Sequence, residues 1–132
     1  MNIRKTASGL EYDFSWSELE NLLRNMDIND RYASEVDVQL LDEQDNFLGY
    51  LTGHAGNTER IAVAWYSQDD GELCHLIDKS PKEIIPVIVG GIIDPDPDPD
   101  FLVPVDMAVT AFRTYFLHQQ KDSDLEWVCT DW

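Results

Sequence analysis

The chain has few basic side chains. Its 9 lysines and arginines stand against 26 aspartates and glutamates, which gives a formal net charge of −17 at pH 7. The basic residues are scattered and form no stripe that could follow a phosphate backbone. Direct binding to nucleic acid is therefore not expected. The negative charge instead attracts cationic surfaces within a Debye length, about 8 Å at physiological ionic strength, so a basic protein is the expected partner.

Cysteines and long apolar segments are also scarce. Only Cys74 and Cys129 are present, each within a strand-like segment, and we expect them to be small buried apolar residues in a reducing compartment. A disulfide between them is possible, but the sequence does not indicate one. No segment approaches the roughly 18 apolar residues of a membrane span, and the basic segment Met1–Gly9 is not followed by the apolar stretch of a signal peptide. The expected location is the cytoplasm, without a membrane partner.

Residues that commonly catalyse reactions or bind metals are few and far apart. His54, His75 and His118 are separated, and adjacent strand residues such as Cys74 and His75 point to opposite faces, so no zinc site or Cys/His dyad is indicated. The sequence has no nucleophile elbow, glycine-rich phosphate loop or metal-binding helix. Most acids lie on turns or polar strand faces, where burial cannot separate the pKa values of a catalytic pair. We therefore expect neither an enzyme nor a bound cofactor.

Apolar residues are nevertheless abundant enough for a folded core. Hydrophobic residues make up 43% of the 132 residues and aromatics 11%, which is unlike a disordered acidic chain. A chain of this length fits one core. We expect a single domain, 1–132, with a negatively charged surface.

An acidic run occupies residues 94–100, where Asp94, Asp96, Asp98 and Asp100 alternate with prolines. Proline fixes φ and removes a backbone donor, so the run should be extended over roughly 20 Å. It resembles a calcium loop only superficially, because Pro99 and Val105 stand where an EF-hand needs glycine and glutamate. Two interpretations remain: a stiff solvated loop, or a contact for a cationic partner.

Two helices are expected, one near each end of the chain. Ser15 and Glu18 form a capping box that predicts a helix ending near Met26. Pro104 opens a second helix whose buried face is expected to contain Ala108, Ala111, Phe112, Tyr115 and Phe116.

Alternating apolar and polar residues predict strands between and after these helices. A strand from Glu35 leads through a polar reversal to Phe47–Thr52, followed by a flexible loop, Gly53–Asn57. Further strands are expected at Arg60–Tyr66 and Leu73–Asp78, joined by a turn with an Asp-Gly pair, and at the chain end around Leu125, Trp127 and Cys129. Pro86 makes the apolar run Ile84–Gly91 an edge strand or a strand that begins after the proline. This order predicts an α+β fold, a mainly antiparallel sheet of five to six strands with two helices packed on it.

The last thirty residues or so carry a resemblance to a known family. Val103-Pro104 opens a helix that contains Ala108 and ends in Phe116-Leu117, and a short loop then leads to a strand bearing Trp127. This arrangement is similar to that of the small immunity proteins that accompany deaminase toxins in bacterial polymorphic toxin and contact-dependent growth inhibition systems. The size, acidity and α+β order also resemble that family, and the Asp-Pro tract looks like an insertion.

The resemblance implies a protein that binds a cognate toxin domain and blocks its active site or substrate path. A toxin that acts on nucleic acid, such as a deaminase or nuclease, would present basic residues that an acidic inhibitor can cover. The candidate contact residues are Asp69, Asp70, Glu72, Asp94, Asp96, Asp98 and Asp100. An alternative is an acidic nucleic-acid mimic or regulatory binding protein without a dedicated toxin, although the irregular spacing of the acids favours it less. A calcium-responsive binding module is a third possibility.

Overall fold

The computed structural model describes residues 2–7, 10–12, 15–27, 29, 34–44, 46–56, 60–80, 88–89, 92–93 and 99–131. Its main sheet has eight strands in the order β10-β6-β5-β4-β3-β1-β2, and β9 pairs with β5 beside this path. All of these pairings are antiparallel. The strands are β1 (Asn2–Ala7), β2 (Leu10–Tyr12), β3 (Glu35–Leu41), β4 (Phe47–Ala55), β5 (Arg60–Ser67), β6 (Glu72–Leu76), β9 (Leu102–Pro104) and β10 (Trp127–Asp131).

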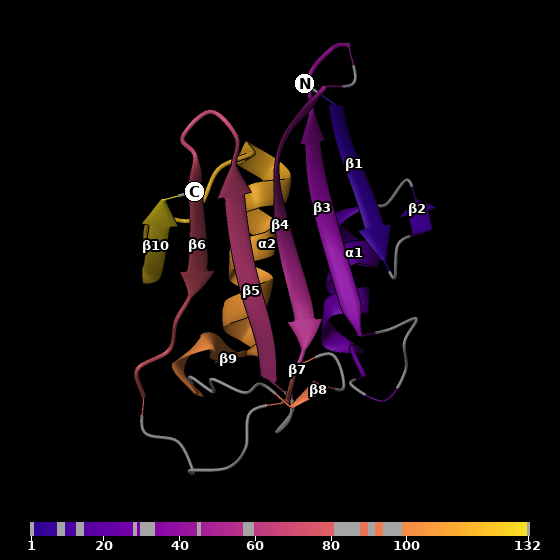
Figure 1. The fold of residues 1–132 in the computed structure, drawn as a ribbon. Helices are drawn as coiled ribbons and strands as arrows, with labels where there is room; N and C mark the ends of the chain where they lie inside the picture. Colours follow the sequence, from indigo (N-terminus) through magenta and orange to yellow (C-terminus); the bar gives the residue numbers. More distant parts are fainter. Residues whose placement is uncertain are drawn as a thin grey trace.

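Both helices pack on one face of this sheet, behind the strands in Figure 1. Helix α1 (Trp16–Arg24) begins as predicted, because the Ser15 side chain accepts a hydrogen bond from the backbone N–H of Glu18 at 3.3 Å. Helix α2 (Val105–His118) follows β9 directly. The predicted α+β fold with an antiparallel sheet and two helices is confirmed, and the sheet also contains β1, β2 and β9.

The core lies between the helices and the sheet. Alternate residues of the central strands point inward, so Val36, Val38, Leu51, Ile61 and Val63 are at most 2% exposed. They meet the buried faces of the helices, which include Leu19, Leu23, Phe112 and Tyr115. The helix periodicity and the strand alternation therefore converge on one apolar layer.

Strand β4 is longer than the sequence predicts. Gly53–Ala55 continues the strand to Ala55, so a flexible loop at these three residues is wrong. A side chain at Gly53 would lie 3.2 Å from the ring of Phe112 and 3.3 Å from Ile61. The glycine thus lets α2 approach the sheet closely, a role that its sequence context does not distinguish from a turn.

Several other boundaries differ from the predictions. Strand β6 ends at Leu76, two residues before the predicted end. Within the apolar run 84–91, residues 88–89 form β7 (Ile88–Val89), which begins after Pro86 and pairs with β8 (Ile92–Ile93) in a separate two-stranded sheet. The remainder of that run lies outside the described residues. A short 3₁₀ turn, η2 (Pro99–Phe101), precedes β9.

The two cysteines form a disulfide, contrary to the expectation of two buried free thiols. Cys74 and Cys129 stand directly opposite each other on the antiparallel strands β6 and β10. Cys74 is fully buried, whereas Cys129 at the sheet edge is exposed. The bond spans 55 residues of sequence and depends on the pairing of the last strand with β6, which no local pattern reveals.

No helix in the described part of the chain is long and apolar enough to cross a membrane.

Candidate protein-binding surface

The face of the sheet opposite the helices carries the candidate functional surface. Successive side chains along β4, β5 and β6 point to opposite sides of the sheet. Leu51, Trp65 and Cys74 point toward the helices. Tyr50, Tyr66 and His75 therefore point toward the other side. We call this second side the open face. Among the described elements, no helix covers it, since α1 and α2 both lie behind the strands in Figure 1.

Three aromatic rings meet on the open face. Tyr50 and Tyr66 are directly paired across β4 and β5, with ring centroids 5.5 Å apart. The ring of Phe47 lies 6.2 Å from Tyr50 and 6.1 Å from Tyr66, and it is nearly parallel to the latter, at an interplanar angle of 10°. We call Phe47, Tyr50 and Tyr66 the aromatic cluster. Such a cluster can supply large, rigid contact area to a partner.

A β-bulge places Phe47 in this cluster. The β3–β4 register shifts between Leu40 and Leu41, so that Leu40 pairs with Gly49 and Leu41 with Phe47. The shift changes the alternation, and Leu48 packs against the core while Phe47 joins Tyr50. As a result Phe47 is 38% exposed, and it is one of the few exposed large apolar side chains among the described residues.

Two acidic turns lie at the same end of the sheet as Phe47. Residues 42–46 connect β3 to β4, residues 68–71 connect β5 to β6, and the backbone N–H of Gln68 donates to the carbonyl of Leu48 at 2.9 Å. We call their carboxylates Asp42, Glu43, Asp69 and Asp70 the acidic rim. Asp42 organises its turn by accepting hydrogen bonds from the backbone and side chain of Asn46, and these bonds lower its pKa. No described lysine or arginine forms an ion pair with the acidic rim.

The predicted contact residues are not gathered in one place. Asp69 and Asp70 are exposed in the β5–β6 turn, but the carboxylate of Glu72 faces the helix side of the sheet, 3.9 Å from the sulfur of Cys74. Asp100 lies at the other end of β6, where its carbonyl accepts from the N–H of Asp78 at 2.8 Å. The length of β6, about 16 Å at 3.3 Å per residue, separates these two ends. Asp94, Asp96 and Asp98 lie outside the described residues.

The surroundings of Asp100 include a cation. Arg60 donates to the carboxylate of Asp78 and to the carbonyl of Leu102, both at 3.0 Å. This half-buried ion pair ties the end of β6 to β9 and so positions the 3₁₀ turn that carries Asp100. The turn that carries Asp100 therefore lies beside an ion pair, whereas the acidic rim has none with a described lysine or arginine.

A cluster of polar side chains occupies the open face where β3 begins and β4 ends, away from the acidic rim. Thr52 donates a hydrogen bond to the carboxylate of Asp37, and the ring nitrogen Nε2 of His54 lies 3.9 Å from Oε1 of Glu35. Burial, helped by a hydrogen bond with Asp37, raises the pKa of Glu35 to about 7, and burial lowers the pKa of His54. At neutral pH the His54–Glu35 contact is therefore not one between two full charges.

The shifted pKa of Glu35 predicts a pH dependence of stability. In the unfolded chain Glu35 ionises near 4.5, whereas the folded protein retains its proton up to about 7. The folded state binds more protons between these values, so the contribution of Glu35 to stability is complete below about pH 4.5 and is lost as the pH rises to about 7. Urea unfolding at pH 4.5, 6 and 7.5 should show wild type losing stability relative to Glu35→Gln. Parallel profiles for the two proteins would contradict the assignment.

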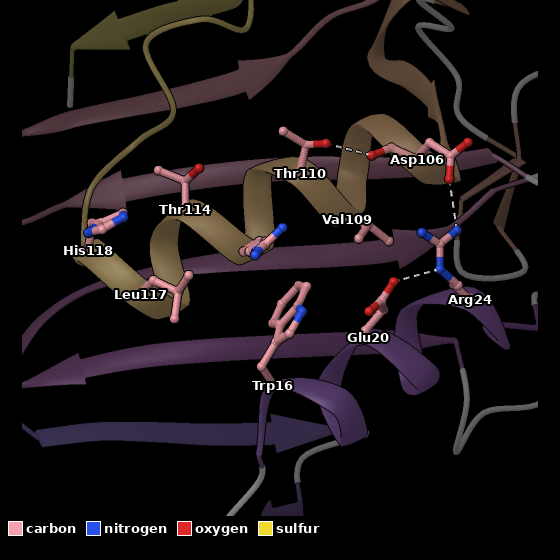
Figure 2. A pocket seen from close by; sticks show the side chains of 10 residues that line it. Trp16, Glu20, Arg24, Asp106, Val109, Thr110, Thr114, Leu117 and His118 are labelled. Carbon is pink, nitrogen blue, oxygen red and sulfur yellow. Dashed lines mark hydrogen bonds and ion pairs between the residues drawn. The ribbon is translucent and has the colours of Figure 1, made fainter.

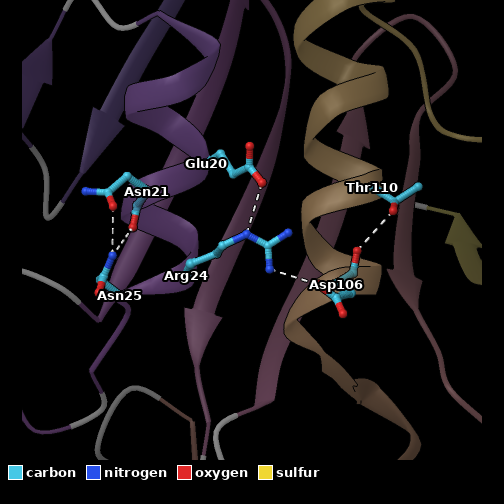
Figure 3. Close-up of polar contacts among 6 residues, drawn as sticks. All are labelled: Glu20, Asn21, Arg24, Asn25, Asp106 and Thr110. Carbon is cyan, nitrogen blue, oxygen red and sulfur yellow. Dashed lines mark hydrogen bonds and ion pairs between the residues drawn. The ribbon is translucent and has the colours of Figure 1, made fainter.

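A groove lies on the outer side of the helices. It has a volume of about 560 Å³ between α1 and α2, and Trp16, Leu117 and His118 are among the residues that line it (Figure 2). Arg24 bridges the two helices through Glu20 at 3.0 Å and Asp106 at 2.8 Å (Figure 3). Exposed ion pairs of this kind contribute little to stability, because solvent and salt screen them. The bridge links the two helices, and the carboxylates of Glu20 and Asp106 are neutralised by Arg24, unlike those of the acidic rim.

The disulfide has a cation beside it. The ammonium of Lys121 lies 3.6 Å from the sulfur of Cys74 and 3.6 Å from that of Cys129, and 4.8 Å from the centre of the Trp65 ring. Glu72 and the two cysteines are also the one group in the described chain that brings three metal-ligating atoms within 4.8 Å of one another. Because both sulfurs are engaged in the disulfide, this group does not offer thiolate ligands in the oxidised protein.

Comparisons of the chain with protein-family models, curated proteins and solved structures find no match in any of the three. The residues and geometry of the open face therefore carry the functional argument.

Proposed function

We propose that this chain is an immunity protein that binds and neutralises a cognate bacterial toxin domain with a basic surface. The observation that supports this function best is the open face, where the partly exposed aromatic cluster lies at the same end of the sheet as the acidic rim. Aromatic side chains at the centre of an interface and charges at its edge are the arrangement that gives both affinity and fast association. A toxin that acts on nucleic acid, a deaminase or nuclease, needs cationic residues to hold phosphate, and this surface complements them.

The proposed mechanism is occlusion rather than catalysis. The chain needs no cofactor to cover an active site or a substrate path, and we regard it as a binder and not an enzyme. The aromatic cluster would exclude water at the centre of the interface, while the carboxylates of the acidic rim would set the association rate and select for cationic partners. One domain comprising residues 1–132 is sufficient for this task.

We place the complex in the cytoplasm, where a toxin would meet nucleic acid. Thiol reductants there open accessible disulfides, and Cys129 is exposed. The proposal therefore requires that the chain remain folded when the bond between Cys74 and Cys129 is reduced.

The test is co-expression with the C-terminal domain encoded by the adjacent upstream gene. We expect that domain to arrest growth by itself, and we expect this chain to restore growth and to co-purify with it as a stable complex. A harmless neighbour that forms no complex would contradict the immunity function. That result would favour the alternative, an acidic mimic or regulator that occupies basic grooves without a dedicated toxin.

The acidic rim should govern the association rate. The double variant Asp69→Asn/Asp70→Asn is expected to associate with the toxin domain about threefold more slowly at low salt, with a flatter dependence of rate on ionic strength, because two steering charges are removed. Stopped-flow fluorescence over a salt series measures both quantities. Asp27→Asn/Asp124→Asn is the matched control, since it removes the same charge from exposed sites elsewhere.

Equal salt slopes in these two double variants would remove the β5–β6 turn from the interface. The fourfold variant Asp94→Asn/Asp96→Asn/Asp98→Asn/Asp100→Asn reports in the same assay on the acidic run 94–100. If its slope alone is flattened, the partner binds there and not at the acidic rim.

A further inference from the structure

A small pocket opens under the β5–β6 turn, beside the acidic rim. Its volume is about 140 Å³, well below the roughly 300–1,000 Å³ of typical ligand sites, so it suits a single side chain. Leu40, Leu48 and Trp65 provide apolar walls, and Ser67, Asp69, Tyr115 and Gln119 provide polar groups. Asp69 is the one carboxylate among the lining residues.

The hydroxyl of Tyr115 has no hydrogen-bond partner, although it is completely buried. Tyr115 is 1% exposed, and its phenol oxygen is the one buried side-chain polar atom among the described residues that lacks a partner. Proteins rarely leave such a group unsatisfied, because its lost hydration is not replaced. Tyr115 is among the residues that line the pocket, so a polar group that enters the pocket meets this side chain, and it reaches the hydroxyl by displacing the neighbouring atoms that cover it.

The electrostatics of the pocket favour a cation. Asp69 carries a negative charge at its edge, with no ion pair to a described lysine or arginine. Helix α2 ends at His118, so its C-terminal carbonyls add partial negative charge near Tyr115 and Gln119. Burial raises the pKa of Tyr115, which keeps the phenol neutral and able to accept a hydrogen bond.

Resting on the proposed function, we propose that this pocket receives one lysine or arginine side chain of the toxin domain. The aliphatic stem lies against Leu40, Leu48 and Trp65, the cationic group pairs with Asp69, and one of its N–H groups donates to the hydroxyl of Tyr115. The pocket lies on the helix side of the sheet, where Trp65 and Tyr115 are, whereas the aromatic cluster lies on the open face. Asp69 belongs both to the pocket and to the acidic rim, so a partner that contacts the pocket and the cluster must extend around this end of the sheet.

Tyr115→Phe is the decisive variant, because it removes only the hydroxyl. In the free protein this deletes an unsatisfied buried group, so the urea midpoint should be unchanged or higher. Binding to the toxin domain, measured by titration calorimetry, should weaken about 10-fold, as expected for a lost hydrogen bond to a charged group. A structural role alone cannot produce weaker binding together with undiminished stability. Equal affinity of Tyr115→Phe and wild type would overturn the proposal.

Asp69→Asn and Asp70→Asn form a matched pair of adjacent single-charge changes, of which only the first lies in the pocket. Asp69→Asn should weaken binding about 10-fold and Asp70→Asn about 3-fold or less. Equal losses of affinity in the two variants would show that Asp69 acts only as one charge of the acidic rim, and they would overturn the proposed occupant of the pocket. Replacing toxin lysines and arginines singly should identify one whose loss is not additive with Asp69→Asn. Wild type that does not bind the domain at all would instead overturn the proposed function, and with it this occupant.

Discussion

Replacing Gly49 with alanine should destabilise the protein by about 3 kcal/mol and weaken binding to the partner. An added Cβ at Gly49 would lie 2.3 Å from the backbone carbonyl oxygen of Tyr66 and 3.4 Å from the Cα of Ser67. Backbone atoms of a paired strand cannot turn aside as a flexible side chain can. The β4–β5 pairing must therefore open locally, and it is this pairing that positions Tyr50 beside Tyr66.

Gly71→Ala is the control for this prediction. Gly71 has a φ of +62° in the β5–β6 turn and open space around it, so alanine there costs about 1–2 kcal/mol through backbone conformation alone. In urea unfolding, Gly49→Ala should have a clearly lower free energy of unfolding than Gly71→Ala. Only Gly49→Ala should disturb the near-ultraviolet circular dichroism of the aromatic cluster. Equal stabilities would mean that β4 and β5 tolerate the added methyl group.

Local patterns in the sequence predict the elements of this fold well. The capping box at Ser15 marks the start of α1, the Asp-Gly pair marks the β5–β6 turn, and Pro104 marks the start of α2. Each of these signals depends on residues within a few positions of one another, where backbone sterics and capping hydrogen bonds act. The fold class and the order of α1, β3 to β7, α2 and β10 follow from such signals, whereas β1, β2, β8 and β9 were not predicted.

The candidate site depends instead on strand register, which the same patterns leave open. Tyr50 and Tyr66 are neighbours only because β4 and β5 pair in one particular register, and Phe47 joins them only through the bulge beside Leu40. Regular alternation along β4 would place Phe47 and Tyr50 on opposite faces, and no local pattern shows which rings become neighbours. Shifting a strand by one residue would move every side chain to the opposite face.

Local sequence patterns do not reveal the pocket or the disulfide, for a related reason. The pocket combines a turn residue, Asp69, with a residue from α2, Tyr115, and its signal is an unsatisfied hydroxyl that only a structure can reveal. The disulfide depends on β10 pairing with β6, 55 residues away. The acidic residues were correctly recognised as exposed at the β5–β6 turn, whereas Glu72 faces the other side of the sheet because it shares the parity of Cys74.

Removing the disulfide should lower the free energy of unfolding by up to about 4 kcal/mol. In the chain-entropy model the effect grows with the length of the loop that the bond closes, here a sequence separation of 55, and it arises because the cross-link restricts the unfolded chain. Cys129→Ser is the suitable variant. The new hydroxyl is exposed at the sheet edge, and Cys74 remains as a buried thiol that packs as a small apolar residue. Urea unfolding should give the same midpoint for Cys129→Ser and for wild type in excess dithiothreitol.

The same variant tests whether the reduced protein can act in the cytoplasm. Strand β10 pairs with β6 over five residues, and we expect this pairing to persist after reduction. The aromatic cluster and the acidic rim lie on other strands and turns. Cys129→Ser should therefore bind the toxin domain with wild-type affinity and still restore growth, even though its unfolding midpoint is lower. If its stability matches that of oxidised wild type, the cross-link does not restrict the unfolded chain as the entropy model requires. If binding is lost while the chain remains folded, β10 contributes to the interface and the proposed surface extends across the sheet to that edge.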